Sequence, residues 1–352
     1  MKENNKNICF VVTNMKSGGL QRNASILANH FDSVGNKVFI CCLYSIDCFF
    51  ELNKGVEIID LTTNKRKIRS LSIWKKSLRD FFDKNNIDSV VSFGERCGIV
   101  TASAIKKRNI NHICRGVNTN PKFINKLFLN LKINNIDHFV FQTNAQKNIY
   151  NKKMQNKGVV ISNPFKLYDK CLNTGEGNKR FVSVASYKIN QKRQDIMVQA
   201  FAKFYVNHPD YSLELYGEVD NNTASIENLI NKLNLKDNVR IMGEKSNVKE
   251  LIVNSRAFIC TSTYEGMPNA MIEALALGIP VITTDWNGYD EIINDKVNGL
   301  VCKMNDVDQI SNAMALIADN DNLFNSIKNN AWHHIICNFN FINVFKKWDE
   351  II

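Results

Sequence analysis

Short apolar runs alternate with amphipathic stretches along the chain, and this is the pattern of strands alternating with helices. In the first half, strand-like runs occur at 8–13, 38–44, 56–60, 89–93, 112–117 and 138–143. After a polar stretch at 168–179, they resume at 180–186, 212–217, 239–243, 257–263 and 280–285. Helical runs such as 20–31 and 193–208 separate them. The order predicts an α/β protein with two doubly wound, Rossmann-like parallel sheets.

The polar stretch at 168–179 divides the two sheets, and 352 residues suit two domains of ordinary size. We therefore predict a first domain at 1–170, a second at 171–330, and a final helix at 331–352 that packs back on the first domain. Two such domains joined by a short linker predict a cleft, with ligands at the carboxyl ends of both sheets.

The composition is that of a folded globular protein, with 44% hydrophobic and 22% charged residues. No stretch approaches the roughly 18 apolar residues of a spanning helix, and the amino-terminal residues do not read as a cleavable signal, so we expect a cytoplasmic protein. The ten cysteines are scattered without a C-x-x-C pair. They are expected to be reduced packing residues.

The charge balance favours an anionic partner, because 45 Lys and Arg face 34 Asp and Glu. Much of the excess lies at 65–84, where eight basic and two acidic residues alternate with apolar ones. The apolar residues recur at near-helical spacing and are Ile73, Trp74, Leu78, Phe81 and Phe82. Two interpretations stay open: a helix that lies on an anionic bilayer through Trp74 and Phe81, or a basic helix whose apolar stripe faces its own core.

The most informative motif lies at 262–288 and reads STYEGMPNAMIEALALGIPVITTDWNG. It places Glu265 in a loop, bends at Gly266 and starts a helix at Pro268, where a missing N–H costs nothing. The amides that then point out of the helix form an anion site, and they belong to Asn269, Ala270 and Met271. Glu273 follows Glu265 with seven residues between them. This spacing suits a ligand whose charged centre caps the helix while a carboxylate on each side accepts hydroxyls, as in a nucleotide diphosphate sugar.

With its E-x7-E spacing, the motif resembles the signature of retaining glycosyltransferase family 4, whose members have the two-domain GT-B architecture. Further ordered matches over 180–302 lie at 192–195, 216–218, 239–243 and 288–300. The resemblance implies that Glu265 contacts donor-sugar hydroxyls near the reacting carbon, that Lys192 contacts the donor phosphates, and that Glu273 holds the ribose. The other donor-binding residues that it implies in this domain are Gly243, Gly266, Met267, Pro268, Asn269, Ala270 and Met271.

Two further phosphate-binding positions follow from the same resemblance. In the first domain, the family's glycine-rich loop matches Gly18 and Gly19, where backbone can approach a phosphate closely. In the second domain, the family's usual Arg before the phosphate-binding Lys is absent, and Tyr187 stands in its place. Lys188, one place further on, can supply the positive charge, although it lacks the bidentate fork of Arg.

The acceptor side is expected at 112–121, where Arg115 and Asn118 are the predicted contacts and His112 is interpreted as structural. Asp306 and Asp308 form a D-x-D string, but a helical run follows, so capping is the favoured interpretation. We expect neither a metal nor any other cofactor.

The resemblance implies transfer of a hexose or N-acetylhexosamine, with retention, from a UDP-sugar to a saccharide or polyprenyl-diphosphate-linked acceptor. It places this reaction in bacterial surface-polysaccharide synthesis, such as capsule or lipopolysaccharide. The basic segment at 65–84 predicts that the enzyme is peripheral on the inner face of the cytoplasmic membrane. A GDP-mannose-dependent transferase and a noncatalytic nucleotide-sugar-binding protein are the alternatives. Nucleic-acid binding, suggested only by the net charge of +11, lacks any recognition motif.

Overall fold

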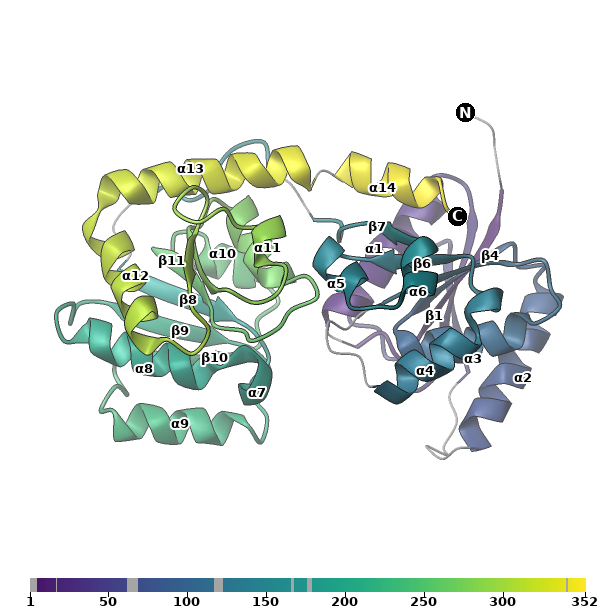
Figure 1. The fold of residues 1–352 in the computed structure, drawn as a ribbon, viewed down its shortest axis with the longest axis horizontal. Helices are drawn as coiled ribbons and strands as arrows, with labels where there is room; N and C mark the ends of the chain where they lie inside the picture. The colour runs from purple at the N-terminus through teal and green to yellow at the C-terminus, as the bar shows by residue number, and fades with distance from the viewer. Residues whose placement is uncertain are drawn as a thin grey trace. The chain divides into compact units, whose positions relative to one another are not determined.

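The computed structural model describes residues 5–16, 18–61, 69–116, 123–165, 168–175, 179–339 and 341–352. The chain forms two compact units (Figure 1). The first comprises Met1–Pro164 together with Ile342–Ile352, and the second is Phe165–Phe341. Each is a parallel sheet covered by helices, so the predicted α/β class with two doubly wound sheets is confirmed.

In the first unit, the described residues form a seven-stranded sheet of order β3-β2-β1-β4-β5-β6-β7. The strands are β1 (Asn7–Val12), β2 (Lys37–Cys42), β3 (Val56–Asp60), β4 (Ser89–Phe93), β5 (Asn111–Arg115), β6 (His138–Phe141) and β7 (Gly158–Val160). β1 is buried on both faces, because Ile8 and Phe10 enter one core cluster while Cys9 and Val11 enter another. This double burial explains why the strand reads as a continuous apolar run.

Helices cover both faces of this first sheet. They are α1 (Gly19–Ser33), α2 (Arg69–Lys84), α3 (Glu95–Ile105), α4 (Phe123–Leu131), α5 (Asn144–Asn148), α6 (Lys152–Asn156) and α14 (Phe341–Asp349), with a 3-10 turn η1 (Ile133–Asn135). α1 and α14 share one core cluster, which includes Phe31 and Trp348. α2 and α3 share the cluster on the other face.

Most of the apolar stripe of α2 belongs to the protein core, as in the second interpretation of this segment, although Ile73 is 43% exposed. Trp74, Leu78 and Phe82 are almost completely buried, and Phe81 packs partly buried against Phe39. The prediction that Trp74 anchors a membrane is therefore wrong, because its side chain is buried in the core. Contact of Phe81 and of the basic residues of this segment with a membrane stays a prediction. Residues 65–68 lie outside the described part of the chain. Among the described residues, no helix has the length and apolar character needed to cross a bilayer.

In the second unit, the described residues form a six-stranded sheet of order β10-β9-β8-β11-β12-β13. The strands are β8 (Arg180–Val184), β9 (Ser212–Tyr216), β10 (Val239–Gly243), β11 (Ala257–Cys260), β12 (Val281–Thr284) and β13 (Leu300–Cys302). The helices are α7 (Ile189–Lys192), α8 (Gln194–Tyr205), α9 (Thr223–Lys232), α10 (Val248–Ile252), α11 (Asn269–Ala276), α12 (Val307–Asp319) and α13 (Asp321–Asn338), with a 3-10 turn η2 (Tyr289–Glu291).

The unit boundaries differ from the predicted ones at 170 and 330. The second unit begins at Phe165, because this ring packs in the second unit's core with Phe339 near the end of α13. The same packing keeps 331–341 in the second unit. The segment that joins the first unit is therefore Ile342–Ile352, where Trp348 is 1% exposed. The predicted cleft between the domains stays a prediction.

The ten cysteines are free thiols, as the sequence analysis predicts. Seven of them are buried, which agrees with a packing role, whereas Cys48 and Cys337 are exposed. Burial also raises the pKa of thiols such as Cys97, to about 12, so these side chains stay protonated at neutral pH.

Candidate functional site

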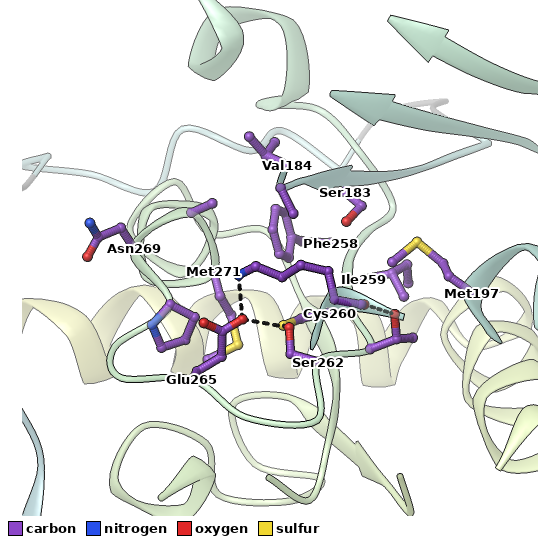
Figure 2. A pocket seen from close by; sticks show the side chains of 15 residues that line it. Ser183, Val184, Met197, Phe258, Ile259, Cys260, Ser262, Glu265, Asn269 and Met271 are labelled. Carbon is purple, nitrogen blue, oxygen red and sulfur yellow. Dashed lines mark hydrogen bonds and ion pairs between the residues drawn. The ribbon is translucent and has the colours of Figure 1, made fainter. Parts of the chain in front are cut away.

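A pocket lies at the carboxyl ends of β8 and β11, where the strand order of the second sheet reverses. In open parallel sheets this reversal point is where ligands bind. The residues that line it are Ser183, Val184, Ala185, Lys192, Met197, Phe258, Ile259, Cys260, Thr261, Ser262, Glu265, Pro268, Asn269, Ala270 and Met271 (Figure 2). Its volume is about 50 Å³, whereas sites that enclose a whole small molecule measure about 300–1,000 Å³. The pocket can therefore enclose only part of a larger ligand.

A buried ion pair occupies the pocket. Lys192 Nζ donates a hydrogen bond to Glu265 Oε1 at 2.5 Å, and Ser262 Oγ donates to the same oxygen at 2.6 Å (Figure 2). The side chains of Lys192 and Glu265 are 20% and 7% exposed. Two donors on one oxygen hold the Glu265 carboxylate in a single orientation. Among the described residues, its second oxygen, Oε2, accepts no hydrogen bond.

Hydrogen bonds between two loops hold Lys192 against Glu265. Arg193 adopts a left-handed conformation, with φ 52°, and ends α7 at Lys192. Thr261 Oγ1 donates to the backbone carbonyls of Lys192 and Arg193 at 2.8 and 2.9 Å. Nearby, the Thr263 N–H donates to the Gln191 carbonyl at 2.8 Å. The loop after β11 thus fixes the end of α7, so the geometry of the ion pair is built into the backbone.

The charges of the pair support each other. Burial by itself lowers the pKa of Lys192, but the nearby Glu265 carboxylate outweighs this effect and raises the pKa above the usual lysine value. The lysine is therefore a cation at neutral pH. A buried pair of this kind is weak evidence for stability, because desolvation offsets much of the attraction. Its position in a pocket points to a role in binding instead.

Helix α11 points its amino terminus at the pocket. Pro268 is the N-cap, so the helix begins at Asn269, one residue later than predicted. The first hydrogen bond of the helix runs from the Ile272 N–H to the Pro268 carbonyl. The amides of Ala270 and Met271 therefore stand outside the helix's own ladder, which is the arrangement that binds anions.

Other predicted donor residues of the second unit lie outside the pocket lining. The Tyr187 ring is buried and its hydroxyl donates to the Leu215 carbonyl at 3.1 Å. A residue of the core therefore stands where the family's Arg is expected. Lys188 caps α7 with an exposed side chain. Glu273 lies 3.5 Å from Lys249 of α10 in an ion pair. Gly243 ends β10 with φ 71°, a conformation that favours glycine.

Gly266 and Met267 complete the predicted donor set without lining the pocket. Both lie between Glu265 and the N-cap of α11, and Met267 is 8% exposed within the core cluster that holds α11. They connect the carboxylate to the helix terminus. Their predicted contact with the donor stays a prediction.

The predicted residues of the first unit lie at the carboxyl ends of β1 and β5. Gly18 is the N-cap of α1 and Gly19 its first residue. Arg115 is 1% exposed, donates to Asn163 Oδ1 and lies 5.4 Å from the centroid of the Phe93 ring. Such burial leaves the guanidinium without surface to offer an acceptor, so a direct contact would require its neighbours to move. Asn118 lies outside the described residues.

The residues weighed as bases or metal ligands have structural roles. His112 is fully buried, with Nδ1 2.8 Å from the Asn135 carbonyl and Nε2 2.9 Å from Ser92 Oγ. Asp306 caps α12 by accepting from the Gln309 N–H at 2.9 Å, as predicted. Asp308 pairs with Lys203 at 2.5 Å. Among the described residues, no group of three or more His, Cys, Asp or Glu could hold a metal ion.

Ser262 and Thr261, which position the ion pair, are not among the site residues predicted from the sequence. Both follow β11 directly, and Ser262 precedes Glu265 by three residues, which is a signal that could have found it. Thr261 carries no such signal, because its partners at Lys192 and Arg193 lie about 70 residues earlier in the chain.

Comparison with known proteins shows which class of protein resembles the part of the chain that contains this pocket. Residues 166–334 match the family described as Glycosyl transferases group 1. The matched residues cover almost all of the second unit. An uncharacterized glycosyltransferase of Haemophilus influenzae is 24% identical over 91% of this chain and 92% of its own length. The protein is therefore a glycosyltransferase, and its pocket lies within the family domain.

Two further proteins extend the comparison. The crystal structure of a glycosyltransferase from Rickettsia africae covers 99% of this chain and 98% of its own, with a TM-score of 0.82 and 22% identity. This structural similarity shows that the chain has the GT-B fold. An Escherichia coli enzyme named UDP-Gal:alpha-D-GlcNAc-diphosphoundecaprenol alpha-1,3-galactosyltransferase is 29% identical over 34% of this chain and 30% of its own length.

Proposed function

We propose that the protein is a retaining transferase that moves a hexose or N-acetylhexosamine from a UDP-sugar to a saccharide or polyprenyl-diphosphate-linked acceptor. The observation that carries this proposal is the buried pair of Lys192 and Glu265 beside the amino terminus of α11. A cation and helix amides suit the diphosphate, and a carboxylate suits the sugar hydroxyls. The small pocket then encloses the reacting linkage, while the rest of the donor extends out of it.

The geometry divides the work between the two charged groups. Lys192 Nζ has three N–H donors, and one of them donates to Glu265. The other two can donate to the donor phosphates and stabilise the leaving diphosphate. Glu265 is held through Oε1, which leaves Oε2 to accept a hydroxyl of the donor sugar. Glu273, held beside Lys249, is proposed to bind the ribose. Gly18 and Gly19 are proposed to approach the donor phosphates from the first unit.

A front-face displacement fits this arrangement. Glu265 is the one carboxylate among the described lining residues, and its ion pair makes it a poor nucleophile. In the proposed step the acceptor oxygen bonds to the anomeric carbon while the bond from that carbon to the diphosphate oxygen breaks. The hydroxyl proton passes to the departing diphosphate. Retention follows because the acceptor enters on the face that the diphosphate leaves.

The nature of donor and acceptor is supported by the E. coli relative, whose name states a UDP-sugar and a lipid diphosphate. A peripheral location on the inner membrane face would bring such an acceptor to the enzyme. We also propose that no metal is needed, since Lys192 and the α11 amides supply the positive charge that a cation supplies elsewhere. A GDP-mannose donor and binding without turnover are the competing functions.

The test is a panel of UDP- and GDP-sugars with a polyprenyl-diphosphate-linked acceptor, read by released nucleotide. We expect release from a UDP-sugar, loss of release in Lys192→Ala, and an α product by NMR. Lys232→Ala of α9 is the matched control, because this lysine is exposed and outside the pocket, whereas Lys188→Ala tests the predicted second charge at the donor phosphates. Release of GDP alone would favour the mannosyltransferase, and tight binding without any release would favour the noncatalytic protein.

A further inference from the structure

Helix α4 of the first unit leaves a group of large apolar side chains in solvent. Leu127, Phe128 and Leu131 are 47%, 47% and 68% exposed. Residues four apart share one face of a helix, so Leu127 and Leu131 lie one turn apart with Phe128 beside them. The buried face of the same helix is carried by Leu129, which is 1% exposed. Clustered exposure of this kind marks an interaction site.

Contacts on two sides fix this helix in the first unit. Asn125 Nδ2 donates to the buried carboxylate of Glu95 at 2.9 Å, at the start of α3. Lys126 Nζ donates to the Ile149 carbonyl at 2.8 Å and lies 5.3 Å from the centroid of the Tyr150 ring. The exposed apolar face is therefore presented by an anchored helix that lies beside α3 (Figure 1).

Two exposed lysines lie at the helix terminus that contacts α4, within a stretch of the chain that is rich in basic residues. Residues 96–164 contain twelve Lys and Arg but a single acidic residue, Asp137, so this stretch carries an excess equal to that of the whole chain. Asn151 Nδ2 donates to Asn130 Oδ1 at 3.3 Å, which places the amino terminus of α6 against α4. The first two residues of α6, Lys152 and Lys153, are exposed.

We propose that this surface docks on an anionic lipid bilayer. We call it the α4 surface and define it as Leu127, Phe128, Leu131, Lys152 and Lys153. Apolar side chains rimmed by lysines match the acyl boundary and the anionic headgroups of a membrane. Lys152 and Lys153 carry exposed positive charge beside the apolar residues, which favours a uniformly anionic surface such as a lipid bilayer over a mixed-charge protein partner. The inference deepens the proposed function, because a docked first unit meets a lipid-linked acceptor.

Vesicle co-sedimentation of the full chain tests the proposal without any turnover. We expect binding to phosphatidylcholine vesicles that contain phosphatidylglycerol, weak binding to phosphatidylcholine alone, and weakening as salt rises. Changing Leu127, Phe128 and Leu131 together to Ser should lower the partition coefficient about tenfold or more. Lys152→Glu with Lys153→Glu should lower it about tenfold at low salt. Circular dichroism checks that both variants fold.

The matched control is Leu71→Ser with Ile73→Ser, which removes the exposed apolar residues of α2. It should bind like the wild type. Equal binding of the α4 variants and the wild type, or loss of binding in the α2 variant alone, overturns the proposal. So does an α4 variant that changes only the molar mass by light scattering, since the surface would then join two copies of the chain. Nucleotide release with a water-soluble acceptor reports separately on the proposed function.

Discussion

The two units share a strand order around their first strands but use buried polar groups differently. In the second unit, Lys192 and Glu265 meet at the carboxyl ends of the strands and line a pocket. In the first unit, His112 and Arg115 of β5 are sealed inside, and their polar partners come from the same unit. The same fold thus uses buried polar groups in one unit to present charge to a ligand and in the other to specify packing.

This contrast predicts two kinds of variant. Changes to the polar groups of the pocket should alter turnover more than folding, because the pocket is open and water can hydrate a group that a substitution leaves without its partner. Changes to the sealed groups should alter folding more than turnover, because an unpaired buried polar group carries its full desolvation cost.

The largest effect is expected for Glu265→Gln. A neutral amide accepts weaker hydrogen bonds from a sugar hydroxyl and no longer pairs with Lys192, so turnover should fall by about 10²–10³-fold. Nucleotide affinity and the thermal midpoint should change little. Glu273→Gln is the control: we expect it to weaken nucleotide affinity, and measured affinity equal to that of the wild type would remove Glu273 from the ribose. Near-normal turnover of Glu265→Gln would contradict the proposed role of this carboxylate.

His112 should make the first unit sensitive to acid. Burial lowers the pKa of His112 to about 4 from 6.5, so below pH 6.5 the unfolded chain binds a proton that the folded chain does not. The free energy of unfolding therefore does not depend on His112 protonation above pH 6.5. It decreases as the pH falls from 6.5 towards 4, by up to about 3 kcal/mol.

Urea unfolding of the wild type and of His112→Gln across this pH range measures the difference. The variant should lose less stability than the wild type over the range, while its turnover at neutral pH stays close to normal. Parallel pH dependence in both proteins would assign the acid sensitivity to other groups.

A smaller effect is expected for Ser262→Ala. Removing the hydroxyl frees the Glu265 carboxylate to rotate while the ion pair with Lys192 persists, so turnover should fall about tenfold. The KM for the nucleotide sugar and the unfolding midpoint should be the same as in the wild type. A Ser262 that acts only in packing would instead shift the midpoint and leave turnover unchanged.

The smallest effect is expected on removing metals. Turnover should be the same with EDTA as with added manganese, because the proposed phosphate contacts come from Lys192 and helix amides. Asp306→Ala should cost about 1 kcal/mol of stability through the lost cap of α12 and leave turnover unchanged. Activity lost in EDTA and restored by manganese would reopen Asp306 and Asp308 as ligands.

The strands could be predicted well because parallel strands buried on both faces leave unbroken apolar runs. The short elements α5, α6 and β7 were missed, since 144–160 is polar and lacks a clear period. For α2, the spacing of apolar residues showed which of them share a helix face but not what packs against that face. For α4, the same spacing did not show that part of the apolar face is exposed to solvent. Burial depends on neighbours distant in sequence, which a local pattern does not contain.

The site divides in the same way. Glu265 and the turn of α11 could be found from a contiguous motif, whereas the different surroundings of Lys188 and Lys192 required the fold. The two lysines are four residues apart, yet one is exposed and the other is turned into the pocket by bonds from Thr261. Those hydrogen bonds join segments separated by about 70 residues, so a local sequence pattern cannot predict them.

The return of the chain to the first unit sets the order in which the protein can be completed on the ribosome. Phe165–Phe341 is contiguous, so the glycosyltransferase family domain can close its core while synthesis continues. The first unit cannot, because Val344, Trp348 and Ile352 fill the core beside α1 and are translated after the second unit. The unit that is translated first is therefore finished second, and until then its incomplete apolar face is open to chaperones or to aggregation.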